Sequence, residues 1–111
     1  MKPEGVVGAY FAGVGARDVE AIRDVFHDHA DLVTAIGVTI DREAIAAFYR
    51  DIAFQFADLE PQPGPLVVDG HRVAVEIALR VNGTTTAAAE VFEVDGDGIR
   101  RLAVYLDRRL D

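Results

Sequence analysis

The chain has 111 residues, half of them hydrophobic, which is long enough to bury one core, so we expect a single domain over residues 1–111. Its net charge of −8 would repel phosphate backbones and anionic lipid surfaces, which argues against nucleic-acid and membrane partners. The absence of cysteine excludes thiol catalysis and disulfides, and no apolar run reaches the roughly 18 residues of a membrane span. Because Met1–Glu4 contains no basic segment leading into an apolar stretch, we expect a cytoplasmic protein.

The first half of the chain has the apolar spacing of three helices. The first is predicted over residues 4 to about 15, and Asp18 is predicted to cap a second. A short strand is expected at residues 32–36, and Asp41 is expected to cap the third and longest helix. The side chains predicted to face inward are Val6, Val7, Tyr10, Phe11 and Val14 in the first helix, Ile22, Val25 and Phe26 in the second, and Ile45, Phe48, Tyr49, Ile52 and Phe56 in the third.

The second half has the turn signals of an antiparallel meander. A rigid connector is predicted at Pro61–Pro65, and β-rich runs follow from residue 66 onward. Asp69-Gly70, Asn82-Gly83 and the segment 95–98 separate these runs at hairpin spacing. Three helices followed by a meander predict an α+β fold, in which the helices pack on one face of the sheet.

The two-residue turn at Asn82-Gly83 predicts which side chains share a sheet face. Counting outward from this turn pairs Val75 with Glu90 and Val73 with Phe92. One face is then apolar except for Glu90. The opposite face is rich in small residues and predicts a flat surface for a homodimer. Its alanines are Ala74, Ala78, Ala87 and Ala89.

Glu90 is the first candidate for a functional site. A carboxylate on an otherwise apolar sheet face under helices must find a partner or shift its pKa upward. A perturbed carboxyl in a pocket is a typical acid or base. The alternative is a glutamate near the open rim that reaches water.

Three stretches of the chain resemble a known family. They are Tyr10–Asp18 continuing through Phe26–Asp31, Ile40–Ile45 continuing through Phe48-Tyr49, and Ile99–Tyr105. They are similar to ketosteroid isomerases and SnoaL-like polyketide cyclases of the NTF2-like superfamily. The resemblance implies an NTF2-like cone, with three N-terminal helices packed on a curved, mostly antiparallel sheet.

The same resemblance implies roles for particular residues. The isomerase tyrosine that stabilises the oxyanion falls on Tyr10, and its second donor, a protonated aspartic acid, falls on Glu90. The aspartate that acts as the isomerase base falls on Thr34, and a threonine does not remove a carbon-bound proton at neutral pH. The expected activity is therefore proton transfer, isomerisation, cyclisation or hydrolysis that differs from the family's steroid mechanism.

We expect a small apolar carbonyl ligand, such as a polyketide, a terpenoid or a steroid-like compound, and no cofactor. Glu90 would transfer the proton, Tyr10 would hydrogen-bond the ligand oxygen, and Thr34 would orient the ligand. The remaining predicted ligand contacts are apolar: Val14, Phe48, Val75, Ile77, Phe92, Leu102, Val104 and Leu106.

Two further hypotheses concern other classes of site. The chain could be a non-catalytic binding or dimerisation module, in which Tyr10 and Glu90 only hydrogen-bond each other. His27 and His29 have a spacing that some metal sites use. No second pair of ligands is evident in the sequence, so we interpret this segment as the solvated end of the second helix and expect no metal.

Overall fold

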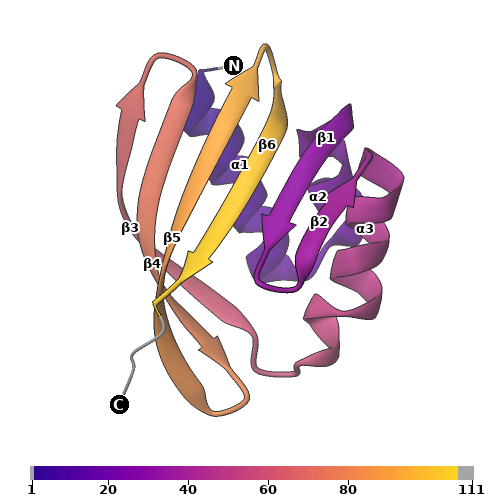
Figure 1. Ribbon diagram of the computed structural model, residues 1–111, viewed down its shortest axis with the longest axis vertical. Helices are drawn as coiled ribbons and strands as arrows, with labels where there is room; N and C mark the ends of the chain where they lie inside the picture. Colours follow the sequence, from indigo (N-terminus) through magenta and orange to yellow (C-terminus); the bar gives the residue numbers. More distant parts are fainter. Residues whose placement is uncertain (1, 108–111) are drawn as a thin grey trace.

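The computed structural model describes residues 2–107. Its helices are α1 (Pro3–Ala16), α2 (Val19–Val25), α3 (Arg42–Asp51) and the short 3-10 helix η1 (Ala53–Gln55). Its strands are β1 (Phe26–Thr34), β2 (Gly37–Ile40), β3 (Glu60–Asp69), β4 (Arg72–Val81), β5 (Thr84–Asp95) and β6 (Gly98–Leu106). The strands form a single curved sheet in the order β2-β1-β6-β5-β4-β3 (Figure 1). Only the β1–β6 pairing is parallel, as expected for a mostly antiparallel sheet.

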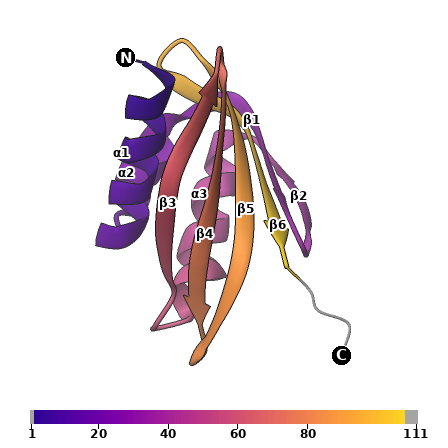
Figure 2. The same cartoon turned by 90° about the vertical axis from the view of Figure 1, so that its left-hand side faces the viewer.

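The helices cover one face of the sheet, and this arrangement confirms the predicted α+β cone (Figure 2). α1 packs across β3, β4, β5 and β6, whereas α3 packs beside β1 and β2. The core lies between these layers, and its largest fully buried side chains include Phe26, Phe92, Ile22, Leu32, Ile45 and Leu102. None of the helices within residues 2–107 is long and apolar enough to cross a membrane.

The first two helices meet in the way that the sequence predicts. α1 ends where Arg17 adopts a left-handed conformation with φ 55°. The carboxylate of Asp18 then accepts a hydrogen bond from the backbone N–H of Ala21 at 3.1 Å, which confirms it as the cap of α2. Gly13 allows the close approach, because a Cβ there would lie 3.1 Å from Cγ1 of Ile22.

Residues 26–40 differ from the prediction. α2 ends at Val25, and Phe26 begins a long strand that pairs with β6 opposite Ile99. Burial of Phe26 against the sheet favours the extended conformation over another helical turn. A second strand, β2, pairs with β1 at the sheet edge. The sequence analysis missed it because the apolar residues Val38 and Ile40 remain exposed and give no core pattern.

The ends of α3 and β3 also differ from the prediction. α3 has 10 residues and α1 has 14, so the prediction that the third helix is the longest was wrong. Phe56 lies beyond α3 and follows η1. Pro61–Pro65 belongs to β3, which begins at Glu60. Proline is tolerated there because β3 is an edge strand with an irregular register between Pro63 and Leu66.

The predicted register of the β4–β5 hairpin is confirmed. Val75 lies opposite Glu90, and Val73 lies opposite Phe92. Asn82 and Gly83 both have positive φ, 57° and 78°, as the tight hairpin turn requires. β6 continues the same parity, because Val104 is the partner of Glu90. Glu90 therefore projects from the middle of the sheet face that the helices cover.

Candidate functional site

An apolar cavity of about 260 Å³ opens between the sheet and α3. Its wall is formed by parts of α1, β1, α3, β4, β5 and β6, together with the segment that joins α3 to β3. Of the residues that the sequence assigns to a ligand site, six line this cavity: Tyr10, Thr34, Phe48, Glu90, Val104 and Leu106. The fold thus brings together the two polar candidates from the first helix and the fifth strand.

Five predicted ligand contacts do not line the cavity, so this part of the prediction was wrong. Four of them come from β4, β5 and β6, which α1 covers, and the fifth comes from α1 itself. Their side chains therefore pack in the core instead of lining the cavity. Each is at most 4% exposed. They are Val14, Val75, Ile77, Phe92 and Leu102.

Glu90 is buried in the cavity wall. Its side chain is 5% exposed, so the alternative that it reaches water at an open rim is wrong. Its Oε1 atom has no hydrogen-bond partner within residues 2–107. Burial raises the pKa of Glu90 from 4.5 to about 7, because the charged form loses the stabilisation that water provides. Near neutral pH the carboxyl is therefore able to give or take a proton.

The hydroxyl of Tyr10 does not bond to Glu90. It lies 2.5 Å from the hydroxyl of Tyr49, which comes from α3. Burial and then the charges of Tyr49 and Glu90 raise the pKa of Tyr10 well above its usual value. Burial also raises the pKa of Tyr49, against the opposing effect of its hydrogen bond with Tyr10. Both phenols are therefore neutral near pH 7.

The tyrosine pair leaves one proton available. Two hydroxyl groups carry two protons, and the single hydrogen bond between Tyr10 and Tyr49 uses one of them. The other O–H is able to donate to a ligand oxygen in the cavity, which both tyrosines line. The charge of Glu90 raises the pKa of both phenols. Its carboxyl therefore lies close enough to both hydroxyl groups to interact with them electrostatically.

Tyr49 is the main functional candidate that the sequence analysis missed. The helical spacing of α3 correctly predicts that Tyr49 faces inward, where it is 5% exposed. That spacing contains no signal that its hydroxyl meets Tyr10 across a gap of 39 residues in sequence. The only available hint is general, because a buried tyrosine hydroxyl usually finds a hydrogen-bond partner.

Thr34 lines the cavity, but its hydroxyl is engaged in the β1–β2 turn. Its Oγ1 accepts a hydrogen bond from the N–H of Ile36 at 3.3 Å, and it donates to the carbonyl of Gly37 at 3.5 Å. The side chain therefore stabilises the turn that carries Ile36 to the cavity wall.

Arg17 holds another part of the wall in place. Its guanidinium donates to the carbonyl oxygens of Phe54, Phe56, Ala57 and Leu59 at distances of 2.8 to 3.3 Å. It also lies 5.2 Å from the centre of the Phe54 ring. The end of α1 thus fixes the segment that carries Phe56 and Leu59 to the cavity.

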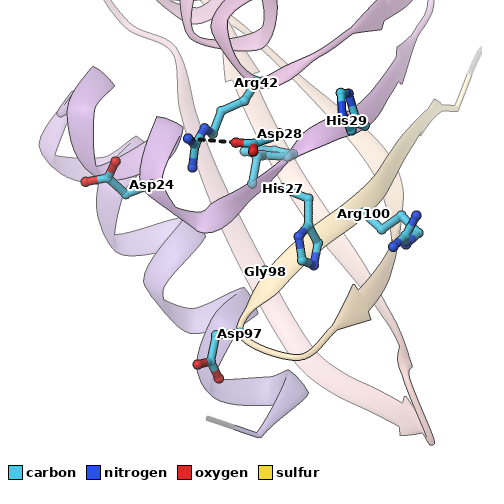
Figure 3. A pocket seen from close by; sticks show the side chains of 9 residues that line it. Asp24, His27, Asp28, His29, Arg42, Asp97, Gly98 and Arg100 are labelled. Atoms are coloured by element: carbon cyan, nitrogen blue, oxygen red, sulfur yellow. Dashed lines mark ion pairs between the residues drawn. The ribbon is translucent and has the colours of Figure 1, made fainter.

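The segment with His27 and His29 lies at a different cleft, which is polar and has a volume of about 550 Å³ (Figure 3). These residues are in β1, so the prediction that they form a helix end was wrong. Nε2 of His27 lies 2.5 Å from the backbone oxygen of Asp95, and Arg42 pairs with Asp28 at 2.7 Å. Residues 2–107 contain no cluster of three or more histidine or acidic side chains that could hold a metal ion.

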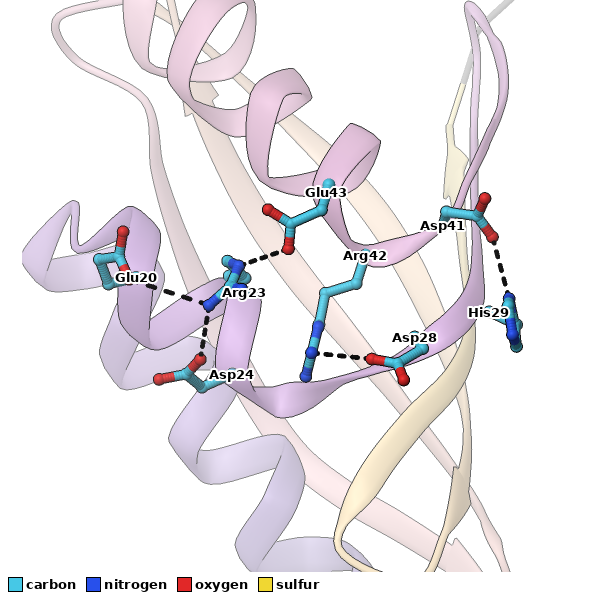
Figure 4. Close-up of polar contacts among 8 residues, drawn as sticks. All are labelled: Glu20, Arg23, Asp24, Asp28, His29, Asp41, Arg42 and Glu43. Atoms are coloured by element: carbon cyan, nitrogen blue, oxygen red, sulfur yellow. Dashed lines mark hydrogen bonds and ion pairs between the residues drawn. The ribbon is translucent and has the colours of Figure 1, made fainter.

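The charges beside this cleft connect secondary structure elements. Figure 4 shows Arg23 of α2 between Glu20, Asp24 and Glu43, the last of which lies in the first turn of α3. The Arg23–Glu43 hydrogen bond is 2.5 Å long and links the two helices. The two arginines that line the cleft, Arg42 and Arg100, pair with Asp28 and Asp95. Because these cations already have acidic partners, the polar cleft is a weaker candidate for a ligand site than the apolar cavity.

Comparisons with known proteins agree with this fold and cavity. Residues 7–103 match the SnoaL-like domain. The chain belongs to the SnoaL-like family. No curated protein is significantly similar to this SnoaL-like chain in sequence.

Solved structures with the same fold include several small proteins. A candidate ketosteroid isomerase from Kribbella flavida has a TM-score of 0.88 at 14% identity, covering 98% of this chain and 80% of that one. A candidate polyketide cyclase from Sinorhizobium meliloti has a TM-score of 0.83 at 18% identity, covering 94% and 99%. TerC, crystallised with polyporic acid, has a TM-score of 0.84 at 19% identity, covering 95% and 91%. The TM-scores, together with 0.85 for an NTF2-like protein from Cytophaga hutchinsonii at 15% identity, covering 96% of this chain and 91% of that one, show that the SnoaL-like protein has the NTF2-like fold.

Proposed function

We propose that this SnoaL-like protein binds a small apolar carbonyl compound and catalyses a proton transfer on it. The observation that carries the proposal is the buried Glu90 carboxyl, whose Oε1 lacks a hydrogen-bond partner among the described residues and which lines an apolar cavity. An orphaned polar atom in such a place is costly unless a ligand satisfies it. The polyketide cyclase and polyporic acid names among the structural neighbours support a polyketide-like or related carbonyl ligand.

The chemistry follows from two groups. The ionised Glu90 removes a proton from the carbon next to the carbonyl, and the electron pair of the broken C–H bond moves onto the carbonyl oxygen. The free O–H of the Tyr10–Tyr49 pair donates a hydrogen bond to this oxygen as its negative charge develops. Glu90, now protonated, returns the proton to the same carbon or to a conjugated one. A base with a pKa near 7 is well suited to this role at neutral pH.

A second function, non-catalytic binding, is favoured by one observation. Glu90 is the only carboxyl among the described residues that line the cavity. The resemblance to ketosteroid isomerases implies that Thr34 stands where those enzymes have their base. In that case Glu90 and the tyrosine pair would only recognise the ligand.

Exchange of the α-protons of a ketone with deuterated solvent, followed by NMR, separates the two functions. The enzyme hypothesis predicts exchange above the buffer rate, and Glu90→Gln should lower it by about a hundredfold or more while binding persists. Glu4→Gln is the matched control, because Glu4 is exposed in the first turn of α1 and does not line the cavity. Binding without any exchange above the buffer rate would leave only the binding function.

A further inference from the structure

The mouth of the cavity is surrounded by exposed hydrophobic side chains. Ile36 is 72% exposed, Ile52 44%, Phe56 41% and Leu106 36%. They come from the β1–β2 turn, the end of α3, the residue after η1 and the end of β6. All four also line the cavity. We call these four residues the apolar rim, and their surface is continuous with the interior.

The chemistry of the opening restricts what it accepts. The described residues that line the cavity and its rim include one charged side chain, Glu90, although the whole chain has 30 charged residues. A ligand that covers these four apolar side chains would remove their surface from water, which is favourable. Exposed apolar groups that lie together around a pocket typically mark a binding surface.

The interior is small for a complete ligand. Its volume of about 260 Å³ lies below the range of about 300 to 1,000 Å³ that is typical of ligand pockets. A compound whose polar group reaches Glu90 and which is larger than this volume must extend past Ile36, Ile52 and Phe56.

The rim is arranged around an opening, whereas the flat alanine-rich face on the other side of the sheet is the surface suited to a second copy of the chain.

We propose that the apolar rim is a second subsite, which binds the hydrophobic tail of an amphiphilic ligand whose carbonyl head group lies at Glu90. This inference rests on the proposed function for the position of the head group. It adds a ligand class: a neutral, elongated carbonyl compound with an alkyl or terpenoid tail. It also identifies Ile36 and Ile52 as residues that determine specificity for tail length.

A series of straight-chain 2-alkanones from 2-hexanone to 2-dodecanone tests the rim by titration calorimetry. Each added methylene that contacts the rim should lower the dissociation constant about two- to fourfold. Ile36→Ser and Ile52→Ser should weaken 2-dodecanone binding about tenfold or more and should change 2-hexanone binding less than twofold. Val67→Ser is the control, because Val67 is 66% exposed on β3 and does not line the cavity.

Several outcomes would overturn the inference. Affinity that stops rising after 2-hexanone, or rim variants that keep the wild-type dependence on length, would show that the tail has no subsite. Rim variants that change the oligomeric state would show that the rim is an interface between copies. Failure of all the ketones to bind would overturn both this inference and the proposed function.

The Glu90→Gln variant distinguishes the two proposals. If both are correct, this variant changes the affinity of every ketone by a similar factor and preserves the dependence on length. If length dependence persists and Glu90→Gln affects neither affinity nor proton exchange, the head-group assignment fails and the rim subsite stands.

Discussion

Glu90→Gln should make the stability of the protein less dependent on pH. The folded-state pKa of Glu90 is about 7, and its ordinary value is 4.5. Between these values the folded protein holds a proton that the unfolded chain has lost. The free energy of unfolding therefore falls as pH rises from about 4.5 to 7, and the cost of burying the charge is fully present above pH 7.

The size of this effect follows from the pKa shift. A shift from 4.5 to about 7 corresponds to about 3 kcal/mol, because each pKa unit is worth about 1.4 kcal/mol. Between pH 5 and pH 8, about 2 to 3 kcal/mol of this cost develops in the wild type and none develops in a glutamine variant. Any penalty for burying the glutamine amide is the same at both pH values, so it does not change the comparison.

Guanidinium chloride unfolding of both proteins at pH 5 and pH 8 measures the effect. The free energy of unfolding of Glu90→Gln minus that of the wild type should be about 2 to 3 kcal/mol more positive at pH 8 than at pH 5. Other ionisable groups cancel in this difference, and Glu4→Gln is the control because Glu4 is exposed in the first turn of α1. A difference that is equal at the two pH values would refute a buried, proton-binding Glu90.

Three further predictions concern neighbouring features. Arg17→Met removes four hydrogen bonds to backbone carbonyls, so it should lower stability by about 1 to 2 kcal/mol and increase amide hydrogen exchange in residues 53–59; unchanged exchange there would contradict its positioning role. Tyr49→Phe should slow ketone proton exchange about tenfold or more with little change in melting temperature, and an unaffected rate would show that the hydroxyl pair is not used. We also propose a homodimer through the alanine-rich sheet face, so light scattering should give about twice 12.0 kDa and Ala89→Arg should give a monomer, whereas a monomeric wild type would contradict the proposal.

The parts of the fold with strong local signals could be predicted from the sequence. Asn82-Gly83 requires a two-residue turn with positive φ, and that turn fixes which residue lies opposite Glu90. Because side chains alternate between the two sheet faces along β5, the carboxyl of Glu90 lies on the face that the helices cover. Asp18 is correctly predicted as a cap because its carboxylate satisfies a free N–H at the start of α2.

The parts that depend on tertiary contacts could not be predicted in the same way. β2 exposes Val38 and Ile40, so no core pattern identifies it. The Tyr10–Tyr49 contact depends on how α1 and α3 are placed over the sheet, which periodicity does not specify. Burial on the sheet face likewise does not separate core residues such as Val75 from cavity residues such as Val104, because the position of α1 decides between them.

A crystal structure of the protein with bound 2-dodecanone tests the position of the ligand most directly. The ketone oxygen should lie about 2.6 to 3.2 Å from a tyrosine hydroxyl or the Glu90 carboxyl, with the tail leaving past Ile36 and Ile52. A ketone oxygen at the mouth with the tail inside, or a ligand bound outside the apolar cavity, would contradict this position.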